Sequence, residues 1–132
     1  MRRYEPDAVV AIAIGGALGA VARCGVAEII TVPPHGFPWA TFWTNISGAF
    51  VLGFFVTFVA ERAPQARYLR PFFAVGFLGS YTTFSTLAVE TVLLVKDGRE
   101  LVGIAYTLAS VAAGLAVAYF GTGLARLASA TR

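Results

Sequence analysis

The chain has 132 residues, of which 58% are hydrophobic and only 13% are charged, and its mean hydropathy is +0.74. Soluble domains carry about 25% charged residues, and a soluble domain this short has too much surface to hide so much apolar material. An ordinary soluble protein is therefore excluded, and we expect an all-α integral membrane protein. The single cysteine, Cys24, and the single histidine, His35, also exclude an internal disulfide and a metal site of four such side chains.

Apolar runs long enough to cross a bilayer, which takes about 20 helical residues, occur at four places. They cover residues 8–31, 38–60, 71–95 and 101–125 of a single domain. Because the connections are short, neighbouring helices are expected to be antiparallel, with both termini on one side of the membrane. The first run is longer than the apolar part of a signal peptide, which has about 7–15 residues, so we expect it to be the first span.

The basic residues of the loops are unevenly divided between the two sides. The side with the termini carries seven: Arg2, Arg3, Arg62, Arg67, Arg70, Arg126 and Arg132. The other side carries two, Lys96 and Arg99. By the positive-inside rule, this bias predicts a multi-pass protein of the cell inner (plasma) membrane with both termini in the cytoplasm. We assign the net charge of +3 to this rule and expect membrane lipid, and no nucleic acid, around the chain.

The first run contains small residues at helical spacing. Gly15 and Gly19 form a GxxxG pair, and Gly16 with Ala20 forms a second small pair beside it. Such faces let helices approach closely in lipid, so we interpret them as packing surfaces. Arg23, further along, indicates either an interfacial position or a water-filled vestibule.

The second run carries the most informative polar residue. Asn45 shares a helical face with Thr41 and Gly48. Its amide has two donors and an acceptor, which are costly to bury unpaired. Two interpretations stay open, a hydrogen bond between helices and a donor directed into a permeation pathway.

The third run is most polar where an apolar anchor should be least polar. Its middle reads GFLGSYTTFSTL over residues 76–87, with hydroxyl side chains at Ser80, Tyr81, Thr82, Thr83, Ser85 and Thr86. Glycine and β-branched threonine lower helix propensity, so we predict a helix broken at mid-membrane over residues 79–83, against the alternative of an unbroken, tightly packed helix. Phe84 follows at once, and the electropositive edge of its ring can face an anion.

The fourth run places Tyr106, Ser110 and Gly114 on one stripe. Across all four runs the hydrogen-bond donors are numerous, whereas only Glu28 and Glu90 are acidic, and both lie toward the ends of their runs. A proton-coupled transporter normally needs an acidic group or histidine at mid-membrane, and no nucleophile–base pair is present. Neutral donors suit passive movement of a small hydrated anion, and four short helices predict a dimer around it.

Three sequence blocks resemble the CrcB/Fluc fluoride channels. They are GGALGAVAR near the start, FPWATFWTNISGAFVLG in the second run and GFLGSYTTFST in the third. The resemblance implies a passive fluoride channel built as an antiparallel dimer of four-helix subunits. It also implies a third helix broken at mid-membrane, whose backbone carbonyls at Gly79 and Thr82 hold a structural sodium ion at the dimer centre.

The resemblance also implies an anion pathway. Its residues in this chain are Asn45, Thr83, Phe84, Ser85, Thr86, Tyr106 and Ser110. The chain departs from the family pattern at Leu87, where a second phenylalanine is usual, and at Gly114, where the polar track often continues. The resemblance leaves two forms of dimer open, a homodimer of copies inserted in opposite directions and a pair with a paralogous four-helix partner. Both departures, together with the charge bias, lead to the hypothesis that this subunit works with a paralogue.

Two other classes of membrane protein are alternatives to the channel. A small multidrug-resistance-type transporter is also a four-helix antiparallel dimer, but it needs a carboxylate in the middle of the first helix, where this chain has Ala13, Ile14 and Gly15. A structural membrane subunit would not need Asn45 together with the TTFS block.

Overall fold

The computed structural model describes residues 5–130, which are helical almost throughout. The elements are α1 (Pro6–Ile29), α2 (Trp39–Arg62), the π-helix η1 (Arg70–Leu78), α3 (Gly79–Tyr81), α4 (Phe84–Lys96) and α5 (Glu100–Ala130). Four segments are long and apolar enough to span a membrane, namely α1, α2, α5 and the third segment, Arg70–Lys96. The expected all-helical fold with four candidate spans is confirmed. Arg2, Arg3 and Arg132, which contribute to the predicted charge bias, lie outside the described residues.

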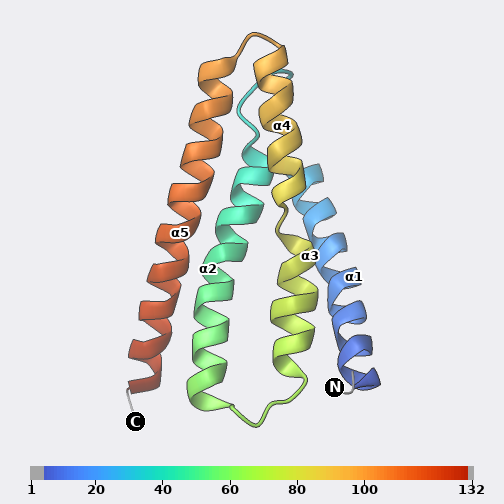
Figure 1. The fold of residues 1–132 in the computed structure, drawn as a ribbon, viewed down its shortest axis with the longest axis vertical. Coiled ribbons are helices and arrows are strands. Elements are labelled where there is room, and N and C mark those ends of the chain that lie inside the picture. Colours follow the sequence, from blue (N-terminus) through green and yellow to red (C-terminus); the bar gives the residue numbers. More distant parts are fainter. Residues whose placement is uncertain (1–4, 131–132) are drawn as a thin grey trace.

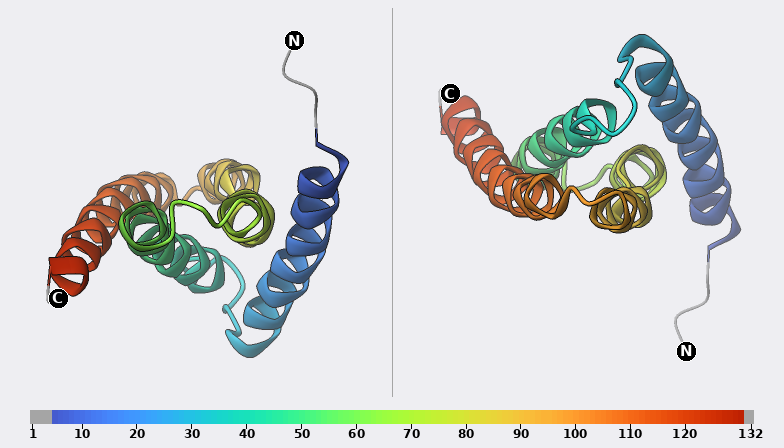
Figure 2. Two further views of the ribbon diagram at one scale, coloured as in Figure 1. Left: turned by 90° about the horizontal axis from the view of Figure 1, so that it is seen from below. Right: turned by 90° about the horizontal axis from the view of Figure 1, so that it is seen from above.

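The four spans alternate in direction. In Figure 1, the start of α1, the end of α5 and the connection from α2 to η1 lie at one end of the molecule, and the other two connections lie at the opposite end. α2 packs chiefly against α5, and α1 packs chiefly against η1. The end-on views of Figure 2 show α1 inclined on the far side of the third span from α5. The third span therefore sits between the α2–α5 pair and α1.

α1 approaches the third span closely through its glycines. Gly15 and Gly19 are buried, and a Cβ atom at either position would run into a backbone carbonyl of η1, that of Phe72 or Phe77. From the other side, a Cβ at Gly76 would lie 2.5 Å from the carbonyl oxygen of Ile12. The predicted packing role of the GxxxG face is confirmed.

Little of the apolar side-chain surface is buried inside one chain. A core cluster of Leu87, Leu94 and Tyr106 joins α4 to α5, whereas Leu101 and Tyr119 on the outside of α5 are 84% and 82% exposed. Since apolar faces of this extent are not stable in water, they belong against lipid or another protein chain.

The third span differs from the prediction in two ways. Its first part is a π-helix, whereas an α-helix was expected there. The expected unwinding over residues 79–83 is too wide, because Gly79–Tyr81 are helical and only Thr82 and Thr83 have extended backbone, with φ/ψ of −76°/155° and −148°/118°. Thr83 then begins α4 as its N-cap, since its Oγ1 accepts a hydrogen bond of 3.1 Å from Thr86 N.

Candidate functional site

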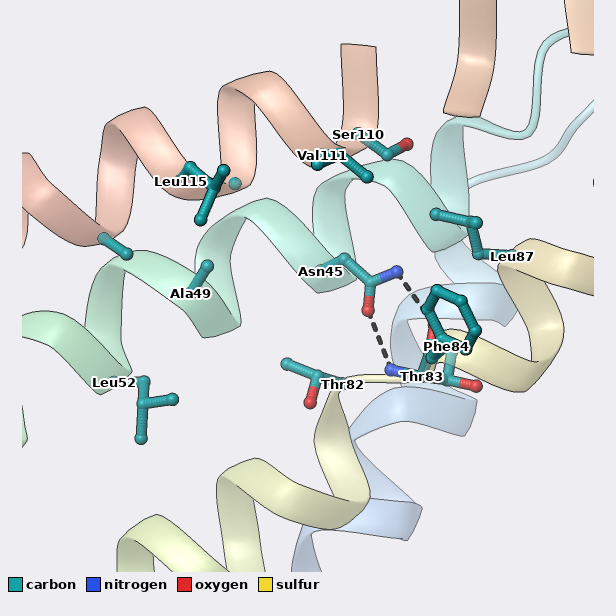
Figure 3. Close-up of a pocket in the computed structure, with 12 residues that line it drawn as sticks. Asn45, Ala49, Leu52, Thr82, Thr83, Phe84, Leu87, Ser110, Val111 and Leu115 are labelled. Atoms are coloured by element: carbon teal, nitrogen blue, oxygen red, sulfur yellow. Dashed lines mark hydrogen bonds between the residues drawn. The ribbon is translucent and has the colours of Figure 1, made fainter. Parts of the chain in front are cut away.

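A pocket of about 390 Å³ lies where α2 and α5 face the junction of α3 and α4. Figure 3 shows its lining, which is apolar apart from polar groups near the junction, at Asn45, Thr82 and Thr83, and Ser110 on α5. The lining residues are Asn45, Ala49, Leu52, Thr82, Thr83, Phe84, Leu87, Ser110, Val111, Gly114, Leu115 and Ala118. The pocket thus brings together four of the predicted pathway residues, Asn45, Thr83, Phe84 and Ser110.

Asn45 is bound to the junction by both ends of its amide. Its Nδ2 donates to the carbonyl oxygen of Thr83 at 2.9 Å, and its Oδ1 accepts from Thr83 N at 2.7 Å. A flipped amide would set donor against donor and acceptor against acceptor, so this pair of bonds fixes its orientation. Of the two alternatives left open by the sequence, the structure contains the bond between spans, while Asn45 still lines the pocket.

The hydroxyl groups after the junction form a small network. Thr83 Oγ1 donates to Thr86 Oγ1 at 2.9 Å and lies 3.2 Å from Ser85 Oγ. Thr83 also lines a second pocket, of about 160 Å³, whose wall includes Arg23 and Thr86. Thr83 is therefore the residue shared by the two pockets, and Arg23 lines the second of them.

Phe84 and Leu87 differ sharply in exposure. Phe84 projects from the start of α4 and is 78% exposed, whereas Leu87 is 6% exposed and packs in the core cluster with Leu94 and Tyr106. Leu87 touches the pocket with an aliphatic side chain. Within one chain, Phe84 is thus the single aromatic residue of the pocket lining.

The stripe on α5 separates into different environments. Ser110 lines the pocket, and its buried Oγ has no hydrogen-bond partner among the described residues. Gly114 also lines the pocket, and a Cβ there would meet nothing within 4 Å. Tyr106 lies outside the lining and is fully buried, in an edge-to-face contact with Phe37 at a centroid distance of 5.2 Å.

Tyr106 is part of a buried polar cluster that sequence reasoning missed. Its hydroxyl donates to Glu90 Oε2 at 2.6 Å, and Thr41 Oγ1 donates to Glu90 Oε1 at 2.9 Å. This cluster joins α2, α4 and α5, and it satisfies both oxygens of the Glu90 carboxylate. The signal was present as an acidic residue inside an apolar run, but its partners come from other helices and could not be paired by spacing.

The carbonyls of Gly79 and Thr82 are left free by the way the junction is bonded. In a continuous helix they would accept from the N–H groups four residues on, those of Thr83 and Thr86. Here Thr83 N bonds to Asn45 and Thr86 N bonds to Thr83 Oγ1, so within residues 5–130 neither carbonyl has a hydrogen-bond donor. Carbonyl oxygens are ligands of hard cations, and Gly79 is exposed while Thr82 is half-buried. The residues present therefore fit a cation held by backbone oxygens.

Side chains, by contrast, offer no metal centre. In residues 5–130, no group of three or more His, Cys, Asp or Glu side chains is arranged to hold a metal ion. Fold and site together define a small polytopic membrane protein whose interhelical pocket is apolar apart from a few neutral polar groups.

Comparison with known proteins identifies its family. The model of the family described as "CrcB-like protein, Camphor Resistance (CrcB)" matches residues 10–122. The "Fluoride-specific ion channel FluC 1" of Mycolicibacterium paratuberculosis is 40% identical over 126 residues, which are 96% of each chain. The "Fluoride-specific ion channel FluC 2" of Nocardia farcinica is 41% identical over 95% of this chain and 89% of its own, and the "Fluoride-specific ion channel FluC" of Rhizobium meliloti is 33% identical over 89% and 95%. The chain belongs to the CrcB family.

Proposed function

We propose that this chain is a subunit of a fluoride channel that passively exports fluoride from the cytoplasm across the inner membrane. The observation that carries the proposal is the pocket at the α3–α4 junction, whose described lining residues include an amide and hydroxyl groups and no carboxylate. The names of the relatives, which are fluoride-specific ion channels, support the same ion.

The chemistry of the lining fits fluoride. A small, strongly hydrated anion needs hydrogen-bond donors in place of its water, and here the second N–H of Asn45 has no partner among the described residues. Ser110 Oγ also has no partner among them, but it is buried and would have to turn toward the pocket to reach an ion. The edge of Phe84 adds a weakly electropositive surface. Since no lysine or arginine of residues 5–130 lines this pocket, the ion is not held too tightly to leave. Such a pathway conducts and performs no covalent chemistry, so the protein is a channel and not an enzyme.

A second subunit completes the pathway. Phe84 is 78% exposed, so the pocket has one aromatic wall and one open side. An antiparallel partner would close that side. It would also help to cover the extended residues Thr82 and Thr83, because backbone groups at mid-membrane must be buried in protein. The partner is either a second copy inserted in the opposite direction or a paralogous four-helix chain, and the charge bias favours the paralogue.

We assign the free carbonyls of Gly79 and Thr82 to a structural sodium ion between the two subunits. When bound, the ion supplies a positive charge that joins two helix junctions. Gly79 and Thr82 would bind the ion through backbone carbonyl oxygens that accept no helical hydrogen bond. If replacing sodium by N-methyl-D-glucamine leaves the dimer as stable as before, this assignment is wrong.

The test of the channel is ion efflux from liposomes that contain the purified protein, alone or copurified with a second four-helix subunit of the same family. Liposomes loaded with potassium fluoride should release fluoride to an ion-selective electrode after valinomycin is added, without any proton gradient. Liposomes loaded with potassium chloride are the control and should retain most of their chloride. Absence of fluoride flux from both preparations, or equal flux of both anions, would contradict the proposal.

A further inference from the structure

The bonds between Asn45 and Thr83 give Asn45 a second role, separate from offering a donor to the ion. We infer that Asn45 is a positioning residue that holds the α3–α4 junction in its extended conformation. The inference deepens the proposed function and rests on it only where ion flux is concerned. The bonds themselves can be measured without any transport.

Thr83 is the point where the third span needs outside support. Its backbone is extended, so its N–H leaves the helical hydrogen-bond ladder and its C=O lies at the very start of α4, and only 7% of the residue is exposed. Unpaired backbone groups cost about 1–3 kcal/mol each when buried in protein and more in hydrocarbon. Asn45 satisfies both groups at once, at 2.9 Å and 2.7 Å. The side-chain amide thus takes the place that a neighbouring strand would have in a sheet.

Next to Asn45, α2 also leaves space for Tyr81 and Thr82, the two residues that precede Thr83. Gly48, one turn further along α2, is buried where the side chains of Thr82 and Tyr81 pass. A Cβ at Gly48 would collide with Thr82 Cγ2 and lie 3.2 Å from Tyr81 Cδ1. α2 therefore contacts residues 81–83 through two successive turns. Asn45 binds Thr83 from one turn, and Gly48 leaves space for Tyr81 and Thr82 at the next.

Two consequences follow for the pathway. With Thr83 fixed, its Oγ1 is placed to cap α4 and to bond Thr86, and Phe84 leaves the helix start toward the pocket. In return, the bonds to Thr83 fix the Asn45 amide, with its Nδ2 toward the carbonyl of Thr83 (Figure 3). We call the two hydrogen bonds between Asn45 and Thr83 the clasp. Its loss should displace Thr83 and Phe84 together.

Hydrogen exchange of Thr83 N–H measures the clasp directly. In protein labelled with ¹⁵N-threonine, Thr83 N–H should exchange slowly although its backbone is not helical. The Asn45→Leu variant has a similar side-chain size and no polar atoms, and it should speed exchange at Thr83 on the order of tenfold, the loss of one hydrogen bond. Thr82 N–H, which bonds to Leu78 O at 3.0 Å inside the helix, is the internal reference and should change much less.

Ser110→Ala is the matched control, because it removes a polar group from the same pocket without touching Thr83. It should leave exchange at Thr83 unchanged. Asn45→Asp is a second variant that keeps an oxygen for Thr83 N–H, and it should retain most of the protection even if Asn45→Leu does not fold. Fast exchange at Thr83 in the unchanged protein, or slow exchange in Asn45→Leu, would overturn the clasp. Full fluoride flux in an Asn45→Leu variant that has lost this protection would overturn its part in permeation, with the channel itself intact.

Discussion

Phe84 is the side chain on which the proposed pathway depends most directly, because it is the aromatic group that one chain brings to the pocket. We expect Phe84→Ile to reduce fluoride efflux at least tenfold, an effect of about 1.4 kcal/mol on the barrier, since an aliphatic group has no electropositive edge. Phe84 is 78% exposed in one chain, and isoleucine keeps an apolar side chain there for the partner to cover, so size-exclusion chromatography should show an unchanged dimer.

Phe120→Ile is the matched control for this prediction. Phe120 is 65% exposed on α5 and lies outside the pocket lining. Its replacement should leave efflux near that of the unchanged protein. Equal loss of flux in the two variants would mean that Phe84 acts through packing rather than through the pathway.

Leu87 tests whether the departure from the family pattern can simply be reversed. Leu87→Phe restores the usual residue, but Leu87 is 6% exposed and packs against Leu94 and Tyr106. Extra volume in a packed core costs about 1–3 kcal/mol, so a thermal melt should show a lower melting temperature with no gain of flux. Leu101→Phe, at an 84% exposed position, is the control. A Leu87→Phe protein of unchanged stability and higher flux would contradict this account.

At the same scale, sequence reasoning found side chains more easily than their partners. Asn45, Thr83 and Ser110 could be selected because a polar group in an apolar run needs a reason. Tyr106 shares a helical face with Ser110, but the structure places it against Glu90, a contact between α4 and α5 that helical spacing does not contain. The bond from Asn45 to Thr83 joins residues 38 positions apart, so it too required the fold.

At the scale of elements, the third span combines a close contact with α1 and a junction held by α2. A Cβ at Gly19 would collide with the backbone carbonyl of Phe77. Unlike the end of a flexible side chain, this carbonyl cannot move aside on its own. We expect Gly19→Ala to separate α1 from η1 and to cost about 1–3 kcal/mol, as overpacking does. A lower melting temperature of the purified protein would be the measured result.

Gly25→Ala lies on the same helix and provides the control. A Cβ at Gly25 would meet nothing within 4 Å, and alanine has the higher helix propensity. This variant should keep or slightly raise the melting temperature. If Gly25→Ala and Gly19→Ala destabilise equally, close approach of α1 is not the reason.

Helix positions were predictable because four long apolar runs separated by proline, glycine and charged residues leave few alternatives. The π-helix η1 was not, because no residue pattern in Arg70–Leu78 separates it from an α-helix. The width of the junction was overestimated at Gly79, since low helix propensity is overridden where tertiary contacts support a helix. Thr83 ends the interruption because it is a good N-cap, and that signal could have been used.

At the scale of the whole molecule, the charge on the loops bears on how a dimer could form. Of the arginines on the side of the termini that the structure describes, Arg62 donates to the carbonyls of Ala128 and Ser129, and Arg67 pairs with Glu5. The side chains of Arg70 and Arg126 form no hydrogen bond or ion pair within residues 5–130. These two are the arginines that can be replaced without removing a contact of the fold.

A strong charge bias inserts every copy in the same direction, whereas an antiparallel dimer of identical chains needs copies in both. We therefore expect the chain alone to give little fluoride flux in liposomes and a paralogous partner to restore it. Replacing Arg2, Arg3, Arg70 and Arg126 by glutamine reduces seven basic residues to three, against two on the other side. This variant should insert in both directions, form dimers by itself and gain flux. Lys96→Gln strengthens the bias and should gain none. Equal flux from the unchanged chain and the four-glutamine variant would mean that the chain already inserts both ways and needs no partner.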